Sequence, residues 1–152
     1  MLLFVHAICM VMFFIFLSVG VGTARYMKKR FKHNRKTQYT SQSWVSIHAI
    51  TALVALLVAS IGIAASFFMV ERMKDRSHFQ SAHSIIGCIL YVLSCVVVPL
   101  FGTTSPLLSL GTNEEPLPAI YIKLHRWLGY GLWFCLIFNL GLGIYTWNSF
   151  YA

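Results

Sequence analysis

The first 24 residues, MLLFVHAICMVMFFIFLSVGVGTA (1–24), carry no charged side chain. About 20 apolar residues in a helix cross the roughly 30 Å hydrocarbon layer of a bilayer, so this stretch is long enough for one membrane span. Three more uncharged stretches follow at residues 37–70, 77–113 and 127–152. A bilayer offers no water to backbone groups, so each span is expected to be helical. The sequence predicts four transmembrane helices, near residues 3–26, 43–70, 80–100 and 121–148.

The composition excludes a soluble protein. Of the 152 residues, 58% are apolar and only 11% are charged, whereas about 25% are charged in an average soluble domain. The length suits one domain. We therefore expect a single domain over residues 1–152, of the all-α class, folded as a transmembrane up-down four-helix bundle.

The net charge of +8 does not indicate nucleic-acid binding, because seven of the basic residues lie between Arg25 and Lys36, separating the first two spans. Such clusters mark cytoplasmic loops. With Lys123 and Arg126 on the same side of the membrane, that side has nine basic residues and the other side has three. We therefore expect a multi-pass membrane protein in contact with lipid, with both termini non-cytoplasmic.

Four of the six histidines lie near the ends of the four predicted spans, one in each span: His6, His48, His83 and His125. Because successive spans alternate in direction, His6 and His83 share one membrane face, and His48 and His125 share the other. The first and third helices of an up-down bundle are diagonal neighbours, as are the second and fourth. The two histidines of each pair are therefore expected to face each other across the interior of the bundle.

Two imidazoles at one level suit haem iron better than zinc, which takes about four close protein ligands. Small residues follow three of the histidines by four positions, namely Ala52, Gly87 and Gly129, and leave room for a flat macrocycle; Met10 follows His6 instead. The alternative for a single intramembrane histidine is a hydrogen bond to a neighbouring helix. Four at matching heights favour a functional role. The stripe of small residues after His48 equally suits helix packing.

Four segments resemble the cytochrome b561 family: HAICMVMFFIFLSVGVGTARY (6–26), WVSIH (44–48), HFQSAHSIIG (78–87) and HRWLGYGLWFCLIFNLGLGI (125–144). The resemblance covers nearly the whole chain. It implies two non-covalent b haems that carry electrons across the membrane, from a cytoplasmic ascorbate-like reductant to ferric iron or monodehydroascorbate, hence an oxidoreductase. It also implies a homodimer. Where ascorbate-using members carry Lys near the second helix, this chain has Gln42, Ser43 and Ser46.

Basic residues at the membrane rims are candidates for the haem propionates: Arg25 and Arg126 for the inner haem, and Arg72, Lys74 or Arg76 for the outer one. Each is equally an interfacial anchor or a topology signal. Lys28, Lys29 and Arg30 would attract an anionic donor, or lipid head groups instead. Two other functions stay open: an accessory subunit of a larger membrane complex, and a proton or metal-ion transporter.

Overall fold

The computed structural model describes residues 1–27, 39–73, 78–102 and 119–151. The elements in chain order are α1 (Leu2–Gly22), the π-helical η1 (Thr23–Met27), α3 (Tyr39–Glu71), α4 (Ala82–Val92), the π-helical η2 (Leu93–Val97) and α6 (Ala119–Tyr151). No strand occurs in these ranges. The predicted all-α class is confirmed.

Four helical stretches are long and apolar enough to cross a membrane: Leu2–Tyr26, Val45–Glu71, Ala82–Gly102 and Lys123–Asn148. Each agrees closely with a predicted span at both ends. The chain is thus a multi-pass membrane protein, with four candidate transmembrane helices among the described residues.

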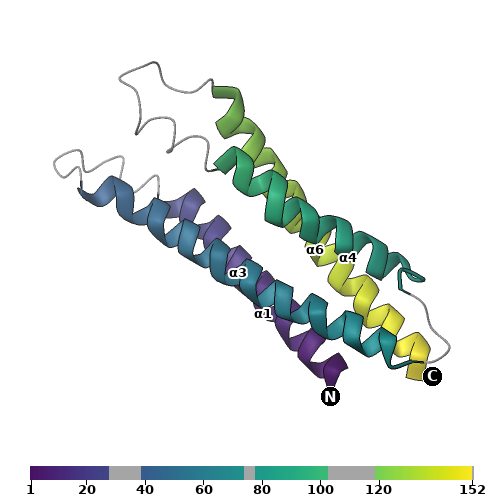
Figure 1. Cartoon of the computed structure of the whole chain (residues 1–152). Helices are drawn as coiled ribbons and strands as arrows, with labels where there is room; N and C mark the ends of the chain where they lie inside the picture. The colour runs from purple at the N-terminus through teal and green to yellow at the C-terminus, as the bar shows by residue number, and fades with distance from the viewer. Residues whose placement is uncertain (28–38, 74–77, 103–118, 152) are drawn as a thin grey trace. The chain divides into compact units, whose positions relative to one another are not determined.

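The chain divides into two compact units, Met1–His78 and Phe79–Ala152, called here the first and the second unit. Each unit is a pair of antiparallel helices joined by a connection: α1 packs along α3 in the first, and α4 packs along α6 in the second (Figure 1).

Small residues on α3 are buried in the first unit. Ala55 and Ala59 are at most 1% exposed. At Gly62, an added Cβ would lie 2.5 Å from Met10 Cε and 2.7 Å from Cys9 Cβ, both on α1. At this position the small-residue stripe is therefore a surface for close helix packing, the alternative that the sequence left open.

A capping box starts α4 in the second unit. The Ser81 hydroxyl accepts a hydrogen bond from the Ser84 backbone N–H at 3.2 Å, and the Ser81 backbone N–H donates to Ser84 Oγ at 3.3 Å. These bonds satisfy backbone donors that the first helical turn leaves unpaired. They also hold the second residue of the helix, His83, in a defined first turn.

The chain continues beyond α4 through the π-helical η2 and returns to α-helix as far as Gly102. In η2 the Val98 backbone N–H donates to Leu93 O, which gives the wider turn of a π-helix. The buried Ser94 hydroxyl donates to Leu90 O at 2.7 Å. A π segment accommodates one extra residue within a helix, and a hydroxyl satisfies a carbonyl that the wider turn disturbs. Neither this segment nor η1 was predicted from the sequence.

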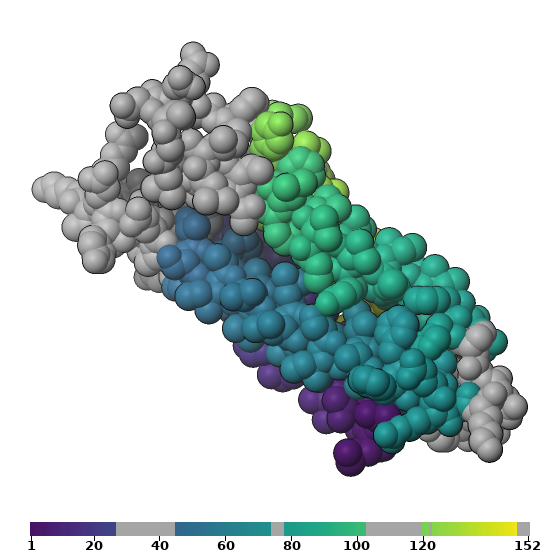
Figure 2. Space-filling view, in the orientation of Figure 1, coloured from purple at the N-terminus to yellow at the C-terminus, as the bar shows by residue number. Residues whose placement is uncertain are grey.

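The outer faces of the helices carry large apolar side chains. Phe4 is 63% exposed, Phe134 65% and Ile144 66%, and the space-filling view shows long unbroken helix surfaces (Figure 2). On a soluble protein such surfaces would be costly. On a membrane protein they face the lipid.

Candidate haem site

Two reciprocal hydrogen bonds join the helices of the first unit. His6 Nδ1 on α1 lies 2.9 Å from Gly62 O on α3, and His48 Nδ1 on α3 lies 2.9 Å from Gly20 O on α1. The interval from His6 to Gly20 along α1 equals the interval from His48 to Gly62 along α3. At a rise of ~1.5 Å per residue, that interval places the two imidazoles about 21 Å apart along the helices.

The second unit repeats this arrangement. His83 Nδ1 on α4 lies 3.0 Å from Asn139 O on α6, and His125 Nδ1 on α6 lies 3.0 Å from Val98 O, beyond η2. His83 and Asn139 have the same separation in sequence as His6 and Gly62. The two histidines of each unit are also equally spaced. The two units are therefore structural repeats with respect to the four histidines.

The hydrogen bond of His125 differs by one residue position from its counterpart in the first unit, the bond of His48. Gly20 and His48 differ by 28 in residue number, whereas Val98 and His125 differ by 27. Val98 is therefore one position farther from His83 than Gly20 is from His6. This additional residue lies in the interval that contains η2, and a π turn absorbs one residue without changing the direction of later carbonyls. The π segment thereby keeps the Val98 carbonyl facing His125.

These hydrogen bonds fix the chemistry of each imidazole. A carbonyl oxygen only accepts, so Nδ1 must carry the proton, and the lone pair of the neutral ring then lies on Nε2. Metal-ligating histidines almost always hold their second ring nitrogen in such a bond, which orients the ring and raises its basicity. All four predicted histidines therefore have the tautomer that a haem ligand needs.

The stabilising effect of these bonds is too small to account for the four imidazoles. Hydrogen bonds between transmembrane helices contribute about 0.6 kcal/mol each on average. Apolar side chains would pack the same interfaces without any polar group to satisfy. Orientation of a ligand is therefore the better explanation of the arrangement than stability.

The residues present fit a haem better than a bare metal ion. Among the described residues, no group of three or more His, Cys, Asp or Glu side chains could hold a metal. A porphyrin supplies four equatorial nitrogens of its own, so it requires only axial ligands from the protein.

Glycines lie against the imidazole rings. A Cβ on Gly143 would lie 2.9 Å from His83 Cε1, and one on Gly102 would lie 2.9 Å from His125 Cε1. Real side chains do not approach so closely, so any larger residue would displace the ring. On Gly20 a Cβ would lie 3.6 Å from His48 Nδ1. Gly143 and Gly102 therefore permit the ring positions of His83 and His125, whereas the distance at Gly20 is an ordinary van der Waals contact.

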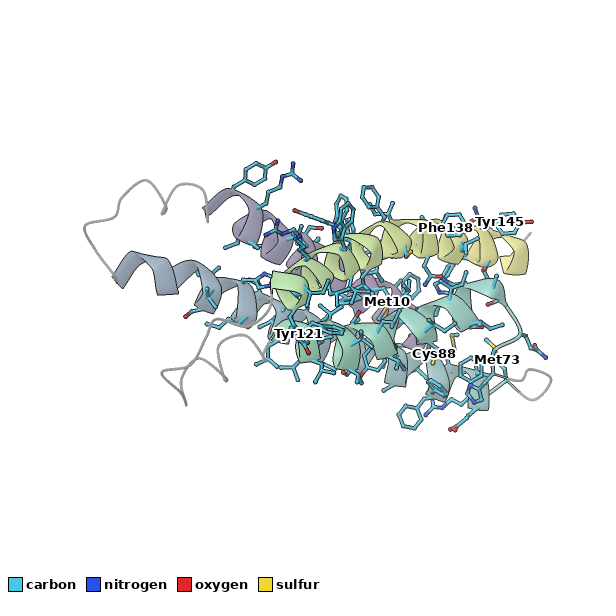
Figure 3. All side chains as sticks on the ribbon, turned by 90° about the horizontal axis from the view of Figure 1, so that it is seen from above. Met10, Met73, Cys88, Tyr121, Phe138 and Tyr145 are labelled. Atoms are coloured by element: carbon cyan, nitrogen blue, oxygen red, sulfur yellow. The ribbon has the colours of Figure 1, made fainter. Side chains whose placement is uncertain are left out.

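Of the small residues singled out in the sequence, Gly87 has a different role from the one expected. Gly87 faces Asn139, whose Nδ2 would lie 3.1 Å from a Cβ at this position. Side-chain packing on α6 therefore occupies the space beside Gly87. Gly129 has no atom within 4 Å of a Cβ position and stays open within the described chain. Met10, labelled in Figure 3, packs against Gly62.

Three of the predicted propionate partners, Arg25, Arg72 and Arg126, are exposed. Arg25 lies in η1, shortly beyond Gly20, and Arg126 directly follows His125. Each is thus near the end of its own unit that holds His48 or His125. Arg72 directly follows the last residue of α3. Lys28, Lys29, Arg30, Lys74 and Arg76 lie outside the described residues.

Two histidines remain, His33 and His78. His78 packs its ring on Phe67, with ring centroids 4.7 Å apart. It is only partly exposed because this aromatic contact covers one side of it. His33 lies outside the described residues.

The four histidines were predicted from the sequence, but their carbonyl partners and the glycines at the rings were not. The available signal was the repeated spacing, since the interval from His6 to His48 is identical to that from His83 to His125. That repeat places Gly62 opposite His6 and Asn139 opposite His83 once the helices are paired.

A comparison with protein families agrees with the resemblance. The family model described as eukaryotic cytochrome b561 matches residues 5–150, which include all four histidines. Searches of curated proteins and of solved structures gave no significant match.

Proposed function

Because the chain belongs to the eukaryotic cytochrome b561 family, whose function is haem-dependent electron transfer across membranes, we propose that it binds two b haems and transfers electrons from a cytoplasmic reductant to an acceptor on the other side. The reductant is an ascorbate-like anion, and the acceptor is ferric iron or monodehydroascorbate. The observation that carries this proposal is the set of four Nδ1–carbonyl hydrogen bonds.

In this proposal His6 and His83 are the axial ligands of one haem, and His48 and His125 are those of the other. The equivalence of His6 with His83, and of His48 with His125, supports the pairing. A bound haem supplies an iron that changes by one electron. The helices hold the imidazoles with Nε2 as the coordinating atom and keep water from the spans.

The exposed guanidinium groups of Arg25 and Arg126 are proposed to bind the propionates of the inner haem. Their place beside the His48 and His125 ends of the helices supports this assignment. Lys28, Lys29 and Arg30 are proposed to raise the local concentration of the anionic donor, an effect that weakens with salt. Since they belong to the basic segment between the first two spans, both termini are proposed to be non-cytoplasmic.

Exposed aromatic side chains favour the second candidate function, an accessory subunit of a membrane complex. Trp127 is 74% exposed and Phe134 65%, which suits a protein partner as well as lipid. In that case the haems would be structural or lost. Haem content and reduction by ascorbate separate the two candidates.

The test uses the purified full chain in sealed vesicles. We expect two haems per chain with bis-imidazole absorbance spectra, reduced by dithionite completely and by ascorbate at a rate that falls as ionic strength rises. Ferricyanide trapped inside the vesicles should be reduced when ascorbate is added to the face that carries the basic segment. Haem that is present but not reduced by ascorbate would favour a protein donor and the accessory role. A chain without haem would contradict the proposal.

A further inference from the structure

The two units place bulk differently beside the histidines of α1 and α4. In the first unit the side chain one turn beyond His6 is Met10, and the facing residue on α3 is Gly62. In the second unit the residue one turn beyond His83 is Gly87, and the facing side chain on α6 is Asn139. At this equivalent contact, the larger side chain comes from the first helix of the first unit, as Met10. In the second unit it comes from the second helix, as Asn139.

This exchange also replaces an apolar group by a polar one. Asn139 is 7% exposed, and its Oδ1 is buried with no hydrogen-bond partner among the described residues. Its Nδ2 lies toward Gly87, and its backbone carbonyl accepts the bond from His83. A buried amide oxygen without a partner is destabilising, and an apolar side chain of similar size would avoid that cost. Packing alone therefore does not account for the amide.

We infer that Asn139 is a positioning residue for the haem proposed at His83 and that its amide lowers the reduction potential of this haem. The inference rests on the proposed function. The backbone carbonyl holds the imidazole, while the partly negative Oδ1 favours the ferric state, which carries one more positive charge than the ferrous state. In an interior of low dielectric constant this preference is little screened.

The first unit offers the contrast. At the equivalent contact, Met10 presents a thioether and a methyl group, which carry little charge. The two histidines proposed for the outer haem would thus have unlike neighbours, an apolar one within the first unit and a polar one within the second. Only the polar one is expected to influence the potential.

The test is a redox titration of the full chain with an external reductant that supplies one electron per haem. His83→Ala identifies the outer component by its loss. In Asn139→Leu we expect both haems to remain, thermal stability to be unchanged or higher, and the ferric-to-ferrous ratio of the outer haem at a fixed potential to fall about tenfold, an upward shift of about 59 mV. The inner haem should not change.

Two further variants keep the inference testable. Asn139→Ala has a smaller side chain and serves where leucine does not fit. It should raise the reduction potential of the outer haem, as Asn139→Leu does. Met10→Leu is the matched control, since it exchanges one apolar side chain for another at the equivalent contact, and it should leave the potential unchanged.

Full haem content with unchanged potential in both Asn139 variants would show a structural amide only and overturn the inference, while leaving the proposed function intact. An equal shift in Met10→Leu would also overturn it, because bulk rather than polarity would then set the potential. A wild-type chain without haem would instead contradict the proposed function itself.

Discussion

The first and second units reach the same pair of histidine–carbonyl bonds by different local structures. Between His6 and Gly20 the helix is regular, whereas between His83 and Val98 it contains η2. Regular helix geometry is therefore not what the two repeats share. They share the direction of four carbonyls, and a π segment is the local adjustment that preserves it where the chain is one residue longer.

The surroundings of the rings differ as well. His83 lies against Gly143, and the counterpart of Gly143 in the first unit is Ser66. Ser66 donates its hydroxyl to Ile63 O within its own helix, at 2.8 Å. The second unit thus requires a glycine where the first contains a side chain. Equivalent histidines are expected to respond differently to equivalent substitutions.

Removal of a ligand is the strongest way to test the equivalence of the two units. His6→Ala and His83→Ala are each expected to abolish the same haem and to halve the haem content, because the two imidazoles share one iron. His48→Ala and His125→Ala should abolish the other. The measurement is the haem-to-protein ratio with the absorbance spectrum of the reduced protein. Loss of the same spectral component in His6→Ala and His125→Ala would show that the pairing is wrong.

A one-residue deletion tests the role of the π segment. Deletion of Val96, a 57% exposed residue of η2, should convert this segment to regular helix. Val98 would then be as far along the chain from His83 as Gly20 is from His6. Both haems should remain. The readout is again haem content.

The matched control deletes Ile15, a 46% exposed residue of α1. No π segment separates His6 from Gly20, so the deletion should rotate Gly20 by about 100° relative to His6. The His48 bond is then lost, and affinity for the inner haem should fall about 10–100-fold. Equal haem loss in the two deletion variants would show that η2 has no compensating role.

Gly143→Ala should have an effect confined to the second unit. Its Cβ would lie 2.9 Å from His83 Cε1 and 3.2 Å from His83 Nδ1, so the ring must move. Affinity for the outer haem should fall about 10–100-fold, measured as haem transfer to an excess of a haem scavenger. Ser66→Ala, the counterpart, should leave this transfer essentially unchanged. Similar losses in both variants would contradict the asymmetry between the units.

The four spans were predictable because their signal is simple. An uncharged stretch longer than the bilayer is thick is visible in composition alone, and a helix is the only open-ended structure that satisfies its backbone in lipid. The histidines were predictable too, since a titratable side chain stands out in such a stretch. Each lies where it was expected, in its own helix.

The partners of the histidines were not predictable in the same way. The four accepting residues are Gly20, Gly62, Val98 and Asn139. They accept through the backbone, so the side chain carries no signal. The π segment was missed for a related reason, because one extra residue in an apolar helix changes neither length nor composition noticeably. Gly87 was interpreted as space for a ring because its facing residue, Asn139, was unknown.

Each histidine–carbonyl bond closes within one pair of helices, and this has a consequence for biogenesis. Membrane helices enter the bilayer in chain order, and α3 completes the first pair before α4 and α6 have been inserted. The imidazoles of His6 and His48 can therefore be oriented while the rest of the chain is still being synthesised. Under the proposed pairing, cofactor capture would follow insertion of the second pair and would fasten two hairpins that had formed separately.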